Sequence, residues 1–270
     1  MLDSTPQKTV TFKLDGKDIS VLEGTTIWEA AQGQGTVIPH LCHKPDPGYR
    51  SDGNCRACMV EIEGERVLAA SCIRSVQDGM VVHSSSERAQ KSRALVVELL
   101  TADQPKAAHD VSSHFLDMAA VNGVSQSRFP ARDASKVPLL DDSHVAMKVN
   151  LDACIHCNLC VRACREVQVN DVIGMAGRGH DAQIVFDMDE PMGQSTCVAC
   201  GECVQACPTG ALMPASILDN AQHGDSKDYD HEVQSVCPYC GVGCQLSFKI
   251  KDDKIKFVEG VNGPANENRL

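Results

Sequence analysis

The sequence has few aromatic residues and lacks the marks of an exported or membrane-spanning protein. Aromatic residues make up 4% of its 270 residues. No apolar run approaches the roughly 18–20 residues of a membrane helix, so we expect no membrane span. The N-terminus has neither a basic stretch followed by an apolar one nor a twin-arginine pair, which predicts a cytoplasmic protein. The net charge of −11 argues against a nucleic-acid partner, because phosphates would be repelled.

Cysteine, by contrast, is abundant, with fifteen residues. An odd number of cysteines in a chain without an export signal fits metal ligands better than disulfides. The cysteines form four groups, of which the last has only three members. The groups are Cys42, Cys55, Cys58 and Cys72; Cys154, Cys157, Cys160 and Cys164; Cys197, Cys200, Cys203 and Cys207; and Cys237, Cys240 and Cys244.

The second and third groups share the spacing C-x2-C-x2-C-x3-C, repeated after 43 residues. Three thiolates at this spacing surround one face of a [4Fe–4S] cubane, and the fourth ligates the other cluster of a two-cluster ferredoxin. The expected ligand sets are Cys154, Cys157, Cys160 and Cys207 for one [4Fe–4S] cluster, and Cys197, Cys200, Cys203 and Cys164 for the other. Pro208 after Cys207 fits the bacterial pattern, whereas Arg165 after Cys164 departs from it. The alternative is a pair of zinc sites, although zinc ribbons use two separated C-x2-C knuckles.

The first group has the spacing C-x12-C-x2-C-x13-C, with a longer first gap than a plant-type [2Fe–2S] site. Polar and apolar residues alternate over 9–14, and Asp15-Gly16 is a hairpin signal before the alternation resumes. Thr25 or Thr26 can cap a helix starting at Ile27. A second hairpin is predicted over 59–67. Together these elements predict a β-grasp domain with a [2Fe–2S] cluster on Cys42, Cys55, Cys58 and Cys72. The alternative is a ubiquitin-like interaction module with a zinc knuckle.

The fourth group, Cys237, Cys240 and Cys244, precedes a predicted hairpin over 246–258 that turns at Asp252-Asp253. Three cysteines would leave a [4Fe–4S] cluster with an open position, so we expect its fourth ligand beyond the chain end. A zinc site with one non-cysteine ligand is the alternative on spacing alone.

A helix is predicted over 87–100, capped by Ser85 or Ser86. Its apolar face would be Val96, Leu99 and Leu100, and its solvated face would carry Glu87, Arg88, Lys91 and Arg93. Further predictions are a short helix over 115–121, a hairpin within 174–186 and a polar linker over 223–230. Gly53, Gly201, Gly241 and Gly243 are candidate N–H donors to cluster sulfurs.

The fold class that follows is α+β. The expected domains are a β-grasp [2Fe–2S] ferredoxin domain (1–84), a helical and loop linker region without a cluster (85–144), a bacterial double-[4Fe–4S] ferredoxin-type domain (145–222) and the start of a further [4Fe–4S] domain (230–270). No acid–base pair, nucleophile triad or phosphate loop stands out, so no catalytic residue is named.

Several runs resemble known redox proteins. Cys154–Gln168 and Ser195–Leu212 resemble the α subunit of soluble, NAD-dependent, molybdenum- or tungsten-containing formate dehydrogenases. The Cys42–Cys72 module is similar to the N-terminal module of the large complex I electron-transfer subunit and of iron-only hydrogenases. The Cys237 motif resembles the first segment of molybdopterin-dependent oxidoreductases, and Gly263–Leu270 resembles the stretch that leads to the fourth cluster cysteine there.

The resemblance implies an iron–sulfur electron relay of a formate dehydrogenase. It implies a molybdenum- or tungsten-bis-pterin guanine dinucleotide in a catalytic region absent from this chain, and a third [4Fe–4S] cluster in the full-length subunit. The implied partners are a flavin subunit that carries FMN and NAD, a small [2Fe–2S] subunit and the rest of the pterin domain. The family's catalytic residues have no counterpart here. Relatives also carry a His-plus-three-Cys cluster after the β-grasp, but His109 and His114 stand here without cysteine, so none is expected. Alternatives are a hydrogenase or complex I subunit and, in another class, a zinc-stabilised interaction scaffold.

Overall fold

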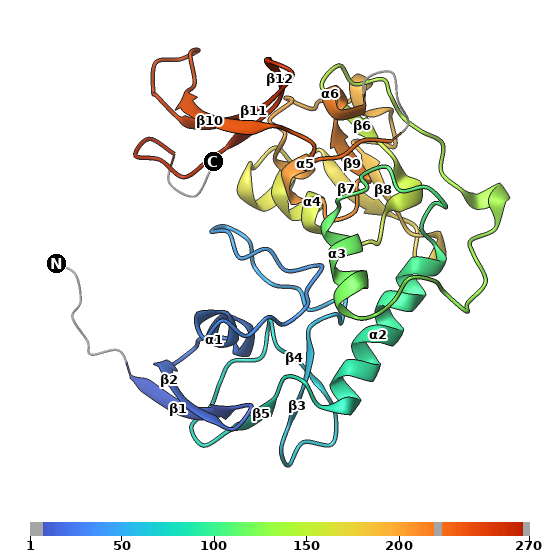
Figure 1. The fold of residues 1–270 in the computed structure, drawn as a ribbon. Helices are drawn as coiled ribbons and strands as arrows, with labels where there is room; N and C mark the ends of the chain where they lie inside the picture. Colours follow the sequence, from blue (N-terminus) through green and yellow to red (C-terminus); the bar gives the residue numbers. More distant parts are fainter. Residues whose placement is uncertain (1–7, 219–222, 267–270) are drawn as a thin grey trace. The chain divides into compact units, whose positions relative to one another are not determined.

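A computed structural model describes residues 8–218 and 223–266 (Figure 1). The chain divides into two compact units. One comprises Met1–His43, Arg50–Ala102 and Met118–Pro130, and the other comprises Lys44–Tyr49, Asp103–Asp117 and Ala131–Leu270. Among the described residues, no helix combines the length and apolar character needed to cross a bilayer. The architecture confirms the predicted α+β class, whereas the four domain boundaries stay a prediction.

The first unit contains a five-stranded sheet with the strand order β2-β1-β5-β3-β4. The strands are β1 (Thr9–Leu14), β2 (Lys17–Leu22), β3 (Met59–Ile62), β4 (Ala69–Ala70) and β5 (Val81–His83). Strand β1 runs parallel to β5 and antiparallel to β2. Asp15 and Gly16 turn the first hairpin with φ of 50° and 83°, the left-handed pair that a two-residue hairpin favours. This hairpin is as predicted.

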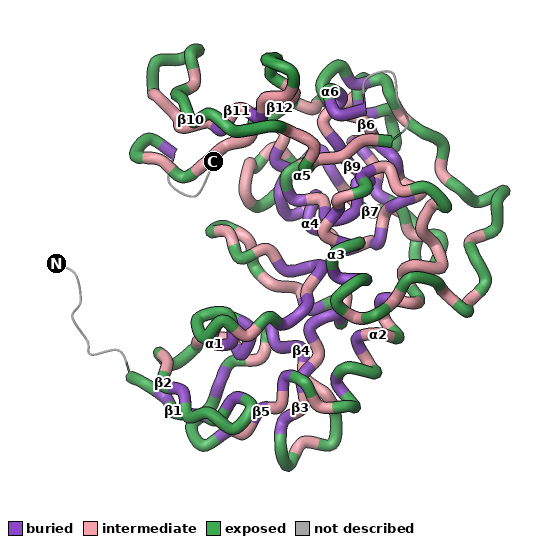
Figure 2. Tube along the Cα trace, in the orientation of Figure 1, coloured by how far each residue is buried: buried purple, intermediate pink, exposed green. Residues whose placement is uncertain are grey.

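Helix α1 (Ile27–Gly33) lies between the first and second hairpins in the sequence. Thr26 caps it: its hydroxyl accepts from the Glu29 N–H, while the Glu29 carboxylate accepts from the Thr26 N–H, which makes a capping box. Ile27 and Trp28 are buried in the same apolar cluster as the inward side chains of β1. Alternate residues of β1 are buried in this core (Figure 2).

The predicted second hairpin is wrong in its returning strand. Strand β3 ends at Ile62, and its partner in the hairpin is Ala69–Ala70, beyond the expected 59–67. The reason is that β3 is shared: Met59 and Val60 pair with β4, whereas Glu61 and Ile62 pair with β5. The residues after Ile62 therefore form a wider connection before the chain returns.

Helix α2 (Glu87–Ala102) forms as predicted, with the Ser86 hydroxyl accepting from the Ala89 N–H. Its buried face was predicted incorrectly. Ala89, Arg93 and Val97 are the buried residues, at i, i+4 and i+8, whereas Leu99 is exposed. The hydrophobicity pattern places Arg93 on the solvated face, but its side chain is buried.

The second unit contains the two similar cysteine runs. Its helices are α3 (His114–Val121, shared with the first unit), α4 (Leu159–Arg162), α5 (Glu202–Ala206) and α6 (Ala215–Leu218), with a π-helical turn over Ala163–Val167. Two antiparallel pairs accompany them: β6 (Met147–Val149) with β9 (Leu212–Pro214), and β7 (Ile173–Ala176) with β8 (Gln183–Phe186). Short 3-10 helices cover Ala134–Lys136, Leu151–Ala153, Gly179–Asp181 and Met192–Gln194. The β7–β8 pair is the predicted hairpin, and α3 matches the predicted short helix.

A three-stranded antiparallel sheet, β10 (His231–Val236), β11 (Gln245–Lys251) and β12 (Lys254–Gly260), follows in the sequence. Asp252 and Asp253 turn the last hairpin with φ of 49° and 58°, as predicted. Strand β10 was not predicted. All six of its residues are exposed, so it lacks the alternation of a half-buried strand. The preceding stretch is also not a free linker, because the His223 ring contacts the Ala108 carbonyl at 2.9 Å.

Candidate metal centres

The first cysteine group converges within the β-grasp unit. Cys58 precedes β3 and Cys72 follows β4, and their sulfurs lie 3.4 Å apart because these strands are neighbours. The Cys42 N–H points at the Cys55 sulfur at 3.4 Å, and the Cys55 N–H points back at the Cys42 sulfur at 3.5 Å. Contacts with Cys55 and Cys72 lower the pKa of Cys42, and contact with Cys72 lowers that of Cys58. The same contacts raise the pKa of Cys55 and Cys72. Four sulfurs this close together suit a soft cation such as iron.

Backbone geometry shapes this loop. Arg56 has a left-handed φ of 58°, and the Ala57 N–H reaches the Cys55 sulfur at 3.5 Å. Gly53 has a left-handed φ of 63°, and a Cβ there would lie 2.8 Å from Ile73 Cδ1, so a side chain at position 53 would be strained and would require Ile73 to shift. The loop is therefore wound tightly before the C-x2-C pair.

Two histidines beside Cys42 belong to the site's surroundings. The Trp28 ring lies edge-on to both His40 and His43, with centroid separations of 4.8 and 4.4 Å. The His43 Nδ1 and the Ser51 hydroxyl are 2.6 Å apart, which ties the two sides of the Cys42–Cys55 connection together. Sequence reasoning did not single out these residues, because the spacing of the cysteines carries no information about them.

The 43-residue repeat of the second unit extends to backbone conformation. His156 and Ala199, equivalent in the two runs, are left-handed, with φ of 54° and 60°. Each directs its N–H at the first sulfur of its run, Cys154 and Cys197, at 3.4 Å. N–H donors aimed at sulfur are the contacts that a metal–thiolate site uses to stabilise negative charge. The donor positions differ from the glycines proposed from the sequence.

The structure brings the cysteines together across the two runs. One small cavity is lined by Cys154, Cys157, Cys160 and Cys207, and a second by Cys164, Cys197, Cys200 and Cys203. The Leu212 N–H reaches the Cys207 sulfur at 3.4 Å, and the Val172 N–H reaches the Cys164 sulfur at 3.3 Å. These crossed sets are the ones that the spacing predicts, and soft thiol donors in enclosed, N–H-lined cavities fit [4Fe–4S] clusters.

Burial sets the protonation of these thiols in the absence of metal. It raises the pKa of Cys154 to about 11, and it raises the pKa of Cys160 and Cys203 as well. Iron must therefore displace protons when it binds. Desolvation also raises the pKa of Cys200, although its residue is exposed.

Two buried charges next to the cysteines were missed from the sequence. Arg162 is fully enclosed, and its guanidinium donates to the carbonyls of Cys157 and Asn158, each at 3.3 Å. Glu202, which precedes Cys203, is also buried, and its carboxylate accepts a hydrogen bond from the Tyr49 hydroxyl. Charged residues are rarely buried unless they are paired, so sequence patterning assigns them to the surface.

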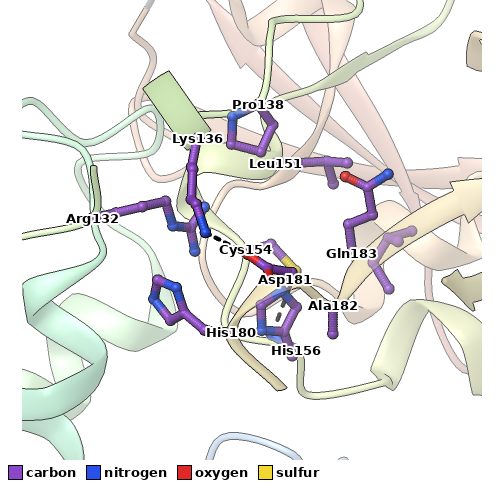
Figure 3. A pocket seen from close by; sticks show the side chains of 11 residues that line it. Arg132, Lys136, Pro138, Leu151, Cys154, His156, His180, Asp181, Ala182 and Gln183 are labelled. Atoms are coloured by element: carbon purple, nitrogen blue, oxygen red, sulfur yellow. Dashed lines mark hydrogen bonds and ion pairs between the residues drawn. The ribbon is translucent and has the colours of Figure 1, made fainter. Parts of the chain in front are cut away.

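A cavity of about 170 Å³ adjoins Cys154 (Figure 3). Arg132, Lys136 and His156 line it, together with His180 and Asp181. Lys136 pairs with Asp181 at 3.0 Å, and burial together with the Arg132 charge lowers the pKa of His156. The surroundings of the Cys154 thiol therefore differ from those of Cys200, which adjoins a larger cavity of about 560 Å³.

The fourth group lies between β10 and β11. The Cys237 N–H donates to the Cys244 carbonyl at 2.7 Å, and Cys240 is exposed. The Asn266 side chain fixes the stretch that follows β12, because its amide oxygen accepts from the Gln245 N–H at 2.8 Å. The final part of the expected Gly263–Leu270 motif, 267–270, lies outside the described residues.

The two histidines considered for an additional cluster both lie in the second unit. His109 Nε2 lies 2.8 Å from the Asp152 carboxylate, and its ring stacks on that of His223 with a centroid separation of 5.8 Å. His114 begins helix α3 and lines the larger cavity.

Comparison with known proteins identifies three successive family matches. Residues 7–87 match the 2Fe-2S iron-sulfur cluster binding domain, 153–211 the 4Fe-4S dicluster domain and 230–270 the molybdopterin oxidoreductase Fe4S4 domain. A chain in a crystal structure of an NAD+-reducing [NiFe]-hydrogenase in the H2-reduced state is 30% identical with a TM-score of 0.68; the match covers 76% of this chain and 87% of that one. The chain belongs to the family of iron–sulfur electron-transfer subunits of NAD-linked oxidoreductases. Its domains are those of iron–sulfur proteins, which does not support the zinc-scaffold alternative.

Curated relatives of this family are longer. An NADH-quinone oxidoreductase subunit of Rhizobium meliloti is 33% identical over 87% of this chain and 27% of its own length. A protein of Staphylococcus haemolyticus, provisionally named a formate dehydrogenase, is 25% identical over 97% of this chain and 30% of its own length. The chain thus spans about a third or less of these two relatives.

Proposed function

We propose that this member of the family is the iron–sulfur relay of an NAD-dependent formate dehydrogenase. The proposed ligands are Cys42, Cys55, Cys58 and Cys72 for a [2Fe–2S] cluster; Cys154, Cys157, Cys160 and Cys207 for one [4Fe–4S] cluster; Cys197, Cys200, Cys203 and Cys164 for the second; and Cys237, Cys240 and Cys244 for a third whose fourth ligand is outside the chain. Iron–sulfur clusters carry single electrons.

One observation carries the choice of formate dehydrogenase: a single chain joins both ferredoxin-type domains to a molybdopterin oxidoreductase Fe4S4 domain over 230–270. That last domain supports a donor site built on a molybdenum- or tungsten-bis-pterin guanine dinucleotide. The relative named as a formate dehydrogenase matches 97% of the chain, which includes this region.

The residues of this chain would hold the relay rather than perform the formate chemistry. They line the two crossed cavities with the thiols and direct N–H groups from His156, Ala199, Val172 and Leu212 at the sulfurs. Because these N–H dipoles already point at the sulfurs, they would stabilise the negative charge that a bound cluster gains when it is reduced. The proposed partners are an FMN- and NAD-binding iron–sulfur subunit, a small [2Fe–2S] subunit and a pterin-binding catalytic region.

A second candidate is an electron-transfer subunit of a hydrogenase or a complex I-like enzyme. The hydrogenase chain, at 30% identity and TM-score 0.68, favours it over the 76% of this chain that it covers. The match of 230–270 to a molybdopterin oxidoreductase Fe4S4 domain supports a pterin-dependent enzyme instead.

The experiment that separates these functions is anaerobic reduction of the complex isolated from its natural host. The complex is mixed in turn with formate, H2 and NADH, and the iron–sulfur signals are followed by electron paramagnetic resonance (EPR). We expect reduction by formate and by NADH, and formate-dependent reduction of NAD. Reduction by H2 but not by formate would contradict the formate assignment and support the hydrogenase. A protein lacking iron and sulfide, yet folded, would contradict both.

A further inference from the structure

Arg93 is an unexpected buried cation in the β-grasp unit. It lies on helix α2 with only 6% of its surface exposed. Its neighbours on the buried helix face are Ala89 and Val97, one turn before and after it. A charge enclosed among small and apolar side chains is costly to bury, so it needs specific compensation.

The compensation comes from the backbone around a predicted cluster ligand. Arg93 Nη1 donates to the Ser84 carbonyl at 2.8 Å and to the Met59 carbonyl at 3.3 Å. Met59 directly follows Cys58, so the carbonyl that binds the guanidinium belongs to the residue next to this thiol. Both acceptors are neutral carbonyls, and the buried Nε makes no hydrogen bond.

The charged groups that favour the Arg93 cation are the Cys58 thiolate and the Asp15 carboxylate. Asp15 is itself engaged by Ser84, whose N–H and hydroxyl donate to it at 2.7 and 2.6 Å. Burial lowers the pKa of Arg93. A guanidinium nevertheless keeps its proton at neutral pH, because its usual pKa is above about 12.

A [2Fe–2S] cluster on four thiolates gains one negative charge when it accepts an electron, with no bond broken and no proton needed. A fixed cation nearby stabilises the reduced form more than the oxidised one, and the effect is larger where water is excluded. Net charge and hydrogen bonding are the means by which proteins set cluster potentials.

We propose that Arg93 sets the reduction potential of the cluster bound by Cys42, Cys55, Cys58 and Cys72, by placing a permanent positive charge beside Cys58. This inference rests on the ligand set of the proposed function. It is independent of whether formate, H2 or NADH supplies the electrons. Arg93 touches no cluster sulfur in the described contacts, so it acts as a potential-setting residue through its charge.

Arg93 also connects α2 to β3 and to the residue after β5, and this structural role has to be separated from the electrostatic one. Arg93→Gln retains a donor but removes the charge, whereas Arg93→Lys retains the charge and changes the hydrogen-bond geometry. Arg88→Gln is the matched control. Arg88 lies on the same helix and pairs with Glu61 at 3.5 Å, but its side chain is 49% exposed.

The measurement is an EPR-monitored redox titration of the [2Fe–2S] signal in the full complex. We expect the midpoint potential to fall in Arg93→Gln and to stay near the wild-type value in Arg93→Lys and Arg88→Gln. An unchanged potential in Arg93→Gln, or an equal fall in Arg93→Lys, would overturn the proposal. If Arg93→Gln does not hold the cluster, Arg93→Met replaces it; cluster loss in both neutral variants would assign Arg93 a structural role and also overturn it.

Failure of the proposed function has a different signature. It would appear in the wild type, as a first cysteine group that holds no iron and gives no [2Fe–2S] signal. A wild-type signal whose potential does not respond to the charge at position 93 overturns the Arg93 proposal alone.

Discussion

The Tyr49 hydroxyl donates a hydrogen bond to the buried Glu202 carboxylate at 2.5 Å. Glu202 directly precedes Cys203, and Tyr49 lies in the long gap between Cys42 and Cys55. Both residues belong to the second compact unit, which includes Lys44–Tyr49. Burial and the Glu202 carboxylate raise the pKa of Tyr49, so the hydroxyl remains a donor at neutral pH. The unusual length of the C-x12-C gap therefore supplies a partner for a buried carboxylate.

Tyr49→Phe should destabilise the second unit. The substitution removes the donor while Glu202 stays buried, and an unsatisfied buried polar group costs about 1–3 kcal/mol. Thermal or denaturant unfolding of the anaerobic protein measures the loss. Tyr239→Phe is the control, because Tyr239 is 90% exposed. Equal stability of Tyr49→Phe and Tyr239→Phe would contradict this role of the hydrogen bond.

When iron is removed, the segments around the crossed cavities of the second unit should unfold earlier than the β-grasp does. The β-grasp has an extensive apolar core that includes Phe12, Ile27 and Trp28, whereas the segments 154–164 and 197–207 line the two cavities with their thiols. Metal binding in such a module supplies folding free energy. Limited proteolysis after anaerobic chelation, read by mass spectrometry, should show early cleavage in those loops. Early cleavage within β1 and β2 instead would show that the apolar core is not sufficient.

Alkylation should report on the proposed ligands cysteine by cysteine. In the iron-loaded protein, Cys200 should resist a thiol reagent although its residue is exposed, because a metal-bound sulfur is not free to react. After chelation under native conditions, Cys200 should react early and Cys160 late, since the Cys200 residue is exposed and the Cys160 residue is buried. Rapid labelling of Cys200 in the loaded protein would contradict its assignment as a ligand.

Gly53→Ala should lower the [2Fe–2S] content. A Cβ at position 53 would lie 2.8 Å from Ile73 Cδ1, and the residue has a left-handed φ. Gly64→Ala is a matched control, since Gly64 also has a left-handed φ but open space around its Cα. Both variants bear the conformational penalty of roughly 1 kcal/mol, but only Gly53→Ala displaces a neighbour beside the cysteine loop. Iron and sulfide analysis per protein should show the larger loss in Gly53→Ala; equal content would mean that Ile73 moves aside freely.

Local sequence patterns predicted hairpins, a helix cap and a turn correctly. The 9–14 alternation with Asp15-Gly16, the Thr26 cap and the Asp252-Asp253 turn each depend on a few neighbouring residues, and each forms as predicted. The returning strand Ala69–Ala70 could not be predicted, because it depends on how β3 divides its pairing between two partners. Cysteine spacing predicted which thiols of the second unit the structure groups together, since the repeated C-x2-C-x2-C-x3-C run is the pattern in which the fourth cysteine joins the opposite run.

The sequence did not predict which charged residues are buried. Arg93, Arg162 and Glu202 look like surface residues in any hydrophobicity pattern, and their acceptors or donors come from other segments of the chain. The same holds for the exposed strand β10, whose partner strand, and not its own periodicity, determines its conformation. Only tertiary contacts can distinguish these residues from an ordinary solvated surface.

The crossing of Cys164 and Cys207 makes the two cysteine runs interdependent. Each cavity is lined by three cysteines of one run and one cysteine of the other. Neither set of four thiols is therefore complete without both runs. An insertion between the two runs is compatible with this arrangement only if its first and last residues lie close together. The β7–β8 hairpin meets this condition, because Ile173 and Phe186 are paired at its base. The interval between the runs can therefore vary in length while the exchange of sulfurs is preserved.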